Sequence, residues 1–302
     1  MGFAVCNNMK YMVKSKQKKK GSEFVVGYID VGGGMRAVYG AGVLDRLIDE
    51  KIQPSYFIGV SAGSANIISY LGDHRGRTLR FYRDYSFRPQ YMGFRNLIKT
   101  GSYINLDYIY STMTNETSED PLNYDAVKSR ECEFFTVATN AKTGKPKYFT
   151  IKDTERNNHY ELKASCSIPI ICKPFEHRDE YYFDGGVSDP IPIQKALDAG
   201  CEKIIIVLTK PISYRKTHKF SQKTYNKMLK EYPETAKLMY SMVEKYNNDL
   251  EYALQLEKEG RVLVLAPDDC CGVNTLKRTR KSIEMLYNKG YNDAEKIKDF
   301  LR

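Results

Sequence analysis

Short apolar runs alternate along this chain with longer stretches in which apolar residues recur every three or four positions. The runs are typical of buried strands, and they occupy residues 24–31, 55–58, 134–139, 148–151, 181–183, 203–208 and 261–265. After the first run, a predicted helix carries its apolar side chains on one face, at Val38, Ala41, Leu44 and Ile48. Because strands alternate with helices, the pattern predicts a three-layer α/β/α sandwich with a mainly parallel central sheet.

Helical periodicity dominates the last third of the chain. Two helices separated by Pro233 are predicted between the last two strands. The second carries an apolar stripe at four-residue spacing, formed by Leu238, Met242, Tyr246, Leu250 and Leu254. The stripe is typical of core packing, but it also suits a cap over a ligand groove. We expect a core over residues 24–210, with residues 211–302 forming a helical region with one further strand on the same domain.

The charge of the chain is concentrated at its beginning. The 302 residues carry a net charge of +10, and residues 1–20 hold six lysines and no acid. Two interpretations of residues 1–23 are open: a solvated, flexible basic leader, or an electrostatic tether to anionic lipid. Gly21-Ser22-Glu23-Phe24 is also compatible with a cloning junction, so the leader has no weight in the functional assignment. No basic helix or recognition module elsewhere predicts nucleic-acid binding.

Cysteine and histidine usage bounds the chemistry. Seven cysteines without a C-x-x-C pair are typical of reduced thiols, which favours a cytoplasmic protein without a disulfide framework. The four histidines are scattered, so we expect no metal site. No run reaches the roughly 18 apolar residues that span a bilayer, and the leader lacks the apolar segment of a secretory signal.

Three short motifs carry candidate chemistry. The first is Gly59-Val60-Ser61-Ala62-Gly63, which stands between an apolar run and a helix-like stretch. A serine between two glycines at a strand-to-helix corner has the sequence form of a nucleophile elbow. There, the free N–H groups and the dipole of the helix favour negative charge. Small-residue turns also occur for structural reasons, so the pentapeptide alone leaves both interpretations open.

The second motif is Gly32-Gly33-Gly34-Met35-Arg36, again between a strand and a helix. Its backbone N–H groups could bind a phosphate or a developing oxyanion. A dinucleotide fingerprint is disfavoured because Ala37 occupies the position of its last glycine. One helix separates this loop from Ser61, and loops after parallel strands open at the same edge of a sheet. We therefore expect the glycine loop to face the serine.

The third motif is Asp184-Gly185-Gly186, which follows the strand at 181–183. Asp-Gly-Gly also occurs in simple tight turns. In this context, however, the carboxylate could accept the serine proton directly.

Together, the glycine loop with Arg36, the Gly-Val-Ser-Ala-Gly elbow and Asp184-Gly185-Gly186 resemble the patatin-like phospholipase family, most closely its bacterial intracellular branch. Ala164-Ser165-Cys166-Ser167-Ile168-Pro169 resembles the segment that precedes the aspartate in that family. The similarity covers residues 26–208. Two positions depart from the family pattern: Ala37 replaces a glycine at the end of the loop motif, and Val31 stands where an acid often precedes the glycines.

The resemblance implies a serine lipid acyl hydrolase (phospholipase A, lysophospholipase or esterase) with a Ser–Asp dyad. Ser61 would be the nucleophile, Asp184 the general base, and residues 32–36 the oxyanion hole. It also implies a phospholipid or other acyl ester as substrate and no cofactor. Nothing in the sequence resembles a calcium-binding module, so we expect no metal requirement. We expect a cytoplasmic enzyme, and peripheral contact with a membrane is left open.

Two alternatives remain open at this stage. An α/β-hydrolase triad could be assembled from Ser61, Asp184 and His218, although its nucleophile would be expected deeper in the chain. A non-catalytic lipid- or nucleotide-binding module on the same fold is the other alternative, and the presence of both Ser61 and Asp184 disfavours it.

Overall fold

The computed structural model describes residues 25–302, so the predicted basic leader and Phe24 lie outside the described residues. An eight-stranded sheet runs through the molecule in the order β5-β6-β3-β2-β1-β7-β8, with β4 also paired to β3. The strands are β1 (Val26–Asp30), β2 (Tyr56–Val60), β3 (Glu133–Asn140), β4 (Pro146–Thr150), β5 (Phe175–His177), β6 (Glu180–Asp184), β7 (Lys203–Val207) and β8 (Val262–Leu265). Strands β3, β2, β1, β7 and β8 are mutually parallel, whereas β4, β5 and β6 are antiparallel to their neighbours.

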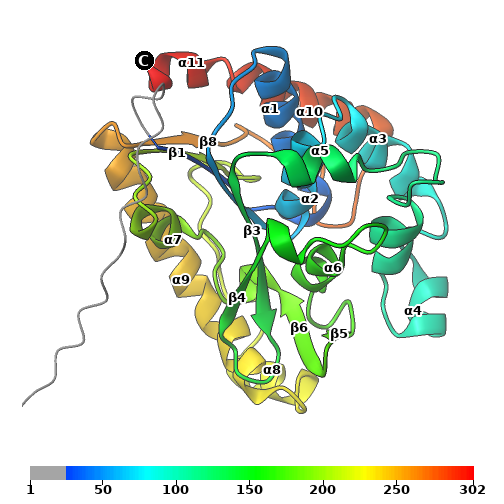
Figure 1. Cartoon of the computed structure of the whole chain (residues 1–302). Helices are drawn as coiled ribbons and strands as arrows, with labels where there is room; N and C mark the ends of the chain where they lie inside the picture. The colour runs from blue at the N-terminus through cyan, green and yellow to red at the C-terminus, as the bar shows by residue number, and fades with distance from the viewer. Residues whose placement is uncertain (1–24) are drawn as a thin grey trace, which may run out of the picture.

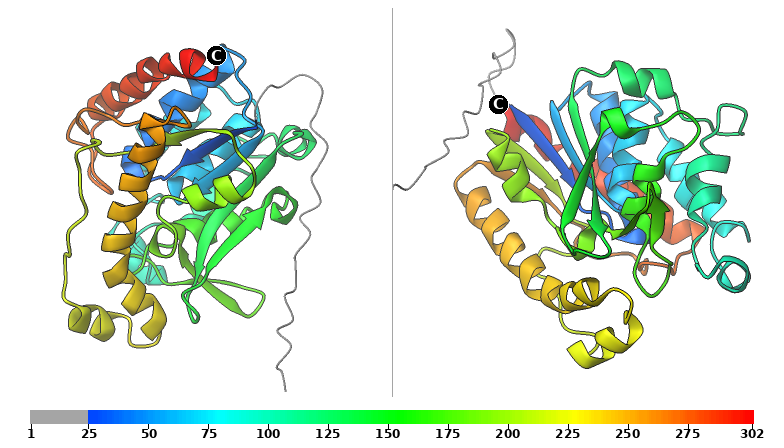
Figure 2. Two further views of the ribbon diagram at one scale, coloured as in Figure 1. Left: turned by 90° about the vertical axis from the view of Figure 1, so that its left-hand side faces the viewer. Right: turned by 60° about the horizontal axis from the view of Figure 1, so that its bottom comes forward.

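Helices cover both faces of the sheet, which gives the predicted three-layer α/β/α sandwich (Figures 1 and 2). They are α1 (Val38–Asp49), α2 (Ala62–Leu71), α3 (Arg77–Arg83), α4 (Phe94–Thr100), α5 (Tyr124–Ser129), α6 (Tyr160–Cys166), α7 (Ile193–Asp198), α8 (Gln222–Met228), α9 (Pro233–Lys258), α10 (Arg280–Asp293) and α11 (Lys296–Leu301). None of the helices within residues 25–302 has the length and apolarity that a membrane-spanning segment needs.

Strand residues alternate between two hydrophobic cores because successive side chains of a strand point to opposite faces. In β1, Tyr28 joins the core beneath α1, α2 and α10, and Ile29 joins the core beneath α7 and α9. The four parallel strands inside the sheet, β3, β2, β1 and β7, are covered on both faces. This explains their nearly continuous apolar sequences.

The C-terminal region packs against the same sheet and its helices. Strand β8 pairs with β7, and α10 packs against α1 (Figure 1). The apolar stripe of α9 has two environments. Tyr246 and Leu250 belong to a hydrophobic core, and Met242 and Tyr246 line the large pocket described below.

The register of β3 brings two chain segments together that are far apart in sequence. Val60 at the end of β2 pairs with Val137, and Asp184 at the end of β6 pairs with the next residue, Ala138. Strand β4 occupies the other edge of β3 along this stretch, so β2 and β6 meet end to end on the same edge. The residues that follow the two strands therefore converge.

Candidate active site

Ser61 occupies a strained corner between β2 and α2. Its backbone angles are φ 56° and ψ −132°, a left-handed conformation that non-glycine residues rarely adopt. Such strain persists only where surrounding contacts enforce it, and it is concentrated at functional sites. The side chain is 6% exposed, so the hydroxyl lies in a confined space at the N-terminus of a buried helix.

The two glycines of the elbow allow close backbone packing. A Cβ on Gly59 would lie 2.4 Å from Ser64 Cα, and a Cβ on Gly63 would lie 2.3 Å from the Asp30 carbonyl oxygen. Both distances are far below a van der Waals contact. The glycines are therefore required where α2 turns back over β1 and β2, which the sequence motif alone does not reveal.

Ser165 of α6 fixes the elbow from the opposite side. Its Oγ accepts a hydrogen bond from the Ser61 N–H at 2.8 Å and donates to the Val137 carbonyl at 2.5 Å. Two residues along, the Ser167 carbonyl accepts the N–H of Asp184 at 2.9 Å. The segment 164–169 thus connects the backbone of both predicted catalytic residues.

The glycine loop packs directly on the elbow. Gly32 has φ 66°, and a Cβ there would lie 2.2 Å from the Val60 carbonyl oxygen. Its N–H donates to Asp30 Oδ1 at 2.9 Å, and the N–H of Met35 donates to the Thr275 carbonyl at 3.1 Å.

These bonds reduce the number of N–H groups available in the predicted oxyanion hole, because those of Gly32 and Met35 are already hydrogen-bonded. The N–H groups of Gly33 and Gly34 form no hydrogen bond within residues 25–302. Arg36, at the edge of the same pocket, has a buried Nε without a partner among those residues.

Asp30 is a site residue that sequence reasoning missed. It is fully buried, and its carboxylate accepts both the Gly32 N–H and the Asn66 Nδ2 of α2 at 2.8 Å. Burial raises the pKa of Asp30 to about 6, against the lowering effect of these two bonds. The position of Asp30 two residues before Gly32 was visible in the sequence, but nothing local showed that its carboxylate binds both the glycine loop and α2.

Asp184 ends β6 and faces the elbow. Its Oδ1 accepts the Gly186 N–H at 2.8 Å, and the residue lines the same pocket as Ser61. Burial raises the pKa of Asp184 to about 6, and the Ser61 hydroxyl, the Gly186 N–H and the charge of Lys216 oppose that rise. Gly185 lies against β3, where a Cβ would be 2.1 Å from the Val137 carbonyl oxygen.

No histidine joins this pair. His218 is exposed and stacks on Tyr240 with ring centroids 4.0 Å apart, and none of the four histidines, all within the described residues, lines the pockets at Ser61. Cys166 lines the small cavity at Ser61, and burial raises the pKa of its thiol. The position of His218 does not support a triad with Ser61.

A pocket of about 640 Å³ opens in front of Ser61, with Asp184 and the three glycines of the loop in its wall. The lining includes apolar side chains of α9, namely Met239, Met242, Val243 and Tyr246. It also includes four cations, Arg36, Lys210, Lys216 and Lys219, and none of them forms an ion pair within the described part of the chain. Asp184 is the only carboxylate in the lining. The pocket therefore combines apolar surface with unpaired positive charge.

Lys216 is held in this pocket by α9. Its backbone N–H donates to Asn247 Oδ1 at 2.8 Å, and Asn247 Nδ2 donates back to its carbonyl at 3.1 Å. The ammonium lies 4.6 Å from the centroid of the Tyr246 ring. Burial lowers the pKa of Lys216 to about 8, although the charge of Asp184 opposes the shift. Nothing in the local sequence marks this lysine.

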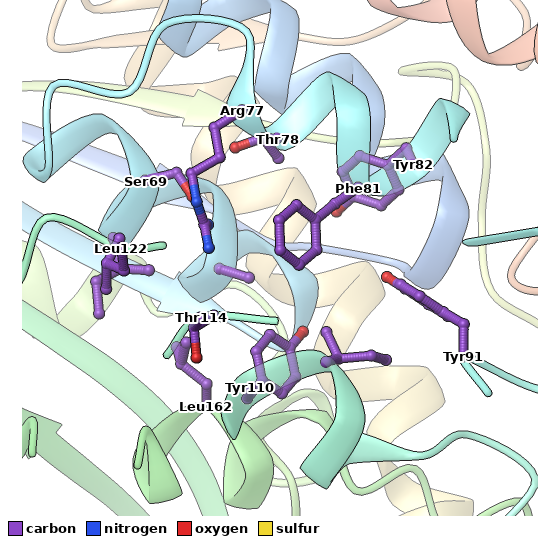
Figure 3. A pocket seen from close by; sticks show the side chains of 13 residues that line it. Ser69, Arg77, Thr78, Phe81, Tyr82, Tyr91, Tyr110, Thr114, Leu122 and Leu162 are labelled. Atoms are coloured by element: carbon purple, nitrogen blue, oxygen red, sulfur yellow. The ribbon is translucent and has the colours of Figure 1, made fainter. Parts of the chain in front are cut away.

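Two small cavities lie on the other side of Ser61. The nearer, about 50 Å³, is lined by Ser61, Met92 and Ile104. The farther, about 30 Å³, lies between α2 and α3 and contains the buried guanidinium of Arg77 (Figure 3). They share a wall of Tyr82, Tyr91, Ile109 and Tyr110. Within residues 25–302, no three His, Cys, Asp or Glu side chains gather closely enough to hold a metal ion.

Comparison with known proteins places this arrangement in a family. The chain is 26% identical over 185 residues to the Uncharacterized protein YjjU of Escherichia coli K12, covering 60% of this chain and 50% of that protein. It is 32% identical over 191 residues to the Probable lipid hydrolase 463L of Invertebrate iridescent virus 6, covering 55% and 61%, respectively. The chain thus spans about half to three fifths of the length of these relatives. Among solved structures, VipD of Legionella pneumophila superposes with a TM-score of 0.47 at 14% identity, covering 90% of this chain and 66% of VipD.

Two family models match the chain. A domain of unknown function (DUF6363) matches residues 232–302. The model described as patatin-like phospholipase matches residues 31–197, more than half of the 302 residues, and contains all three motifs of the site. The chain therefore belongs to the patatin-like phospholipase family.

Proposed function

We propose that this protein is a serine lipid acyl hydrolase that uses a Ser61–Asp184 dyad. The observation that carries the proposal is the strained Ser61, which lines the same pocket as the buried carboxylate of Asp184 with no histidine in that lining. A serine hydroxyl is a weak nucleophile until an adjacent base takes its proton. Asp184 is the only titratable base that lines the large pocket beside Ser61 and is ionised at neutral pH.

The proposed reaction has two halves. Ser61 Oγ attacks the ester carbonyl while Asp184 takes its proton, and the carbonyl oxygen becomes an oxyanion that the free N–H groups of Gly33 and Gly34 stabilise. When the C–O bond breaks, Asp184 returns the proton to the leaving alcohol and an acyl-enzyme remains. Asp184 then takes a proton from water, whose oxygen attacks the acyl carbonyl. Asp184 returns that proton to Ser61 Oγ as the bond between Oγ and the acyl group breaks and the fatty acid leaves.

The pocket favours an acyl ester that also carries an anionic group, such as a phospholipid or lysophospholipid. The apolar wall of α9 suits acyl carbons, and the unpaired Lys216 and Arg36 suit a phosphate. The sequence similarity to a probable lipid hydrolase supports the same substrate class.

A fluorophosphonate probe and a substrate panel test the proposal. The folded protein is expected to be labelled and to hydrolyse at least one carboxylic or phospholipid ester, and Ser61→Ala is expected to abolish both. Ser64→Ala is the matched control, because it removes a buried hydroxyl one turn along the same helix and is expected to leave labelling intact. Absence of labelling in the folded wild type would favour a non-catalytic binding module.

The pH dependence of hydrolysis gives an independent test. The base must be ionised to accept a proton, and the pKa of Asp184 is about 6, so kcat/KM is expected to fall as pH drops through about 6. Lys216 lowers the pKa of Asp184, so Lys216→Met is expected to move this acid limb to higher pH. Lys219→Met removes an exposed cation from the same pocket, whose charge solvent screens, so the acid limb of this variant is expected to stay in place. Equal behaviour of the two variants would contradict the assignment of the limb to Asp184.

A further inference from the structure

Helix α4 exposes its apolar side chains and buries a polar one, the reverse of the pattern in a helix that packs on a hydrophobic core. The only buried member of its seven residues is polar: Asn96 donates to the Gln90 carbonyl at 3.2 Å. Its apolar side chains point outward, with Phe94 74% exposed, Ile98 85% and Leu97 37%. Single exposed apolar residues are common on protein surfaces, but a cluster of them marks a site that is covered in function.

A fourth exposed apolar residue lies beside helix α4. Ile170 is 44% exposed and has φ 74°, a conformation that is costly for a β-branched residue. The Tyr103 N–H donates to the Ile171 carbonyl at 2.9 Å, and the Lys173 N–H donates to Ser102 Oγ at 3.1 Å. The chain after α4 therefore runs alongside the turn that carries Ile170.

These two segments form the rim of the active-site cavities. Met92 and Ile104, which form a β-bridge at the base of α4, line the small cavity at Ser61. Ile168, Pro169 and Ile171 line the large pocket. Helix α4 itself lies at the edge of the molecule (Figure 1).

Positive charge accompanies this apolar surface. Arg95 and Lys99 of α4 and Lys173 beside it are exposed, and none of them forms an ion pair within residues 25–302. Residues 88–106 contain no aspartate or glutamate. Apolar side chains flanked by unpaired cations are the composition that binds the interface of a membrane with anionic lipids.

We infer that the α4 patch, formed by Phe94, Leu97, Ile98 and Ile170 with Arg95, Lys99 and Lys173, docks the protein on an anionic lipid surface. The apolar residues enter the headgroup boundary and the cations contact lipid phosphates. The docking does not require hydrolysis, so it can be measured in a protein that lacks the nucleophile.

The chain contains no tryptophan, so a single introduced one reports its own environment. In a Ser61→Ala background, Phe94→Trp is expected to shift its emission to shorter wavelength when vesicles containing phosphatidylserine are added. Met285→Trp is the matched control, because Met285 is 47% exposed on α10, outside the patch. An unshifted spectrum for Phe94→Trp, or an equal shift for both variants, would overturn the inference.

Vesicle co-sedimentation measures the energetic contribution of the patch. The Phe94→Ser/Ile98→Ser variant, made in full-length Ser61→Ala protein, is expected to bind phosphatidylserine vesicles at least tenfold more weakly than its parent, and Met285→Ser is expected to bind as the parent does. Equal binding of all three would assign attachment to another region, such as the basic leader, and would refute the α4 patch. Loss of self-association in the variant without any change in vesicle binding would make the patch an interface between two copies of the chain and refute it as well.

A soluble short-chain ester separates this inference from the proposed chemistry. In proteins that retain Ser61, Phe94→Ser/Ile98→Ser is expected to leave hydrolysis of the soluble ester unchanged and to reduce hydrolysis of vesicle lipid. If no ester is hydrolysed by any protein but the vesicle results hold, the chemistry fails and the docking surface stands.

Discussion

Replacing Asp184 by asparagine is expected to lower kcat/KM for an acyl ester by about 10³-fold or more, because the Ser61 proton then has no acceptor. The folded state is expected to survive the change. Burial raises the pKa of Asp184 to about 6, above the usual 3.8, so at pH 7 folding disfavours the ionised side chain. A neutral amide of the same shape removes that cost. The free energy of unfolding at pH 7 is therefore expected to stay the same or rise.

His218→Ala separates the dyad from a triad. His218 is exposed, stacks on Tyr240 and does not line the pocket, so its removal is expected to leave kcat/KM near the wild-type value. Steady-state kinetics on one soluble ester, with unfolding curves for the same proteins, give both readouts. A 10³-fold loss in His218→Ala, or an active Asp184→Asn protein, would refute direct proton transfer to the aspartate.

Local sequence was sufficient to predict the strands and the loops that follow them. The apolar runs predicted the strands, because the central strands are buried on both faces and their sequences contain few polar residues. The three motifs lie on loops after strands, and parallel pairing brings such loops to one edge of a sheet. Ser61, Asp184 and the glycine loop were therefore predictable as a group. The helices between residues 73 and 175 were not, since their short sequences mix aromatic and polar residues without a clear period.

The residues that hold the site in place depend on contacts between distant segments. Ser165 reaches Ser61 across 104 positions, and Lys216 is positioned by Asn247 across 31. A serine in a small-residue segment and a lysine in a basic loop have no local signature of such roles. For the same reason the sequence could not show that the Met35 N–H is already hydrogen-bonded, because its acceptor Thr275 lies near the other end of the chain.

The second large effect is expected on the free energy of unfolding, from a buried ion cluster beside α2. The Arg77 side chain of this cluster lies between α2 and α3 (Figure 3). Its side chain is 4% exposed; Nη1 donates to Ser69 Oγ of α2 at 2.9 Å, and Nε lies 3.5 Å from Asp120. Burial lowers the pKa of Arg77 to about 10, and Asp120 opposes that shift. Asp120 also binds Arg80 at 2.7 Å and accepts the hydroxyl of Tyr85 at 3.1 Å. One carboxylate therefore compensates two guanidinium groups.

Asp120→Asn is thus expected to reduce the free energy of unfolding by about 3–5 kcal/mol, because it leaves the Arg77 charge buried without a counter-ion. Arg77→Met is expected to cost less, since Asp120 keeps Arg80 as its partner and methionine fills apolar space. Asp84→Asn is the matched control: Asp84 pairs with Arg83 near the surface, where ion pairs contribute little, and its loss is expected to stay within about 1 kcal/mol. Urea unfolding curves measure all three. Equal losses for Asp120→Asn and Asp84→Asn would show that the cluster behaves as an exposed pair, contrary to its burial between α2 and α3.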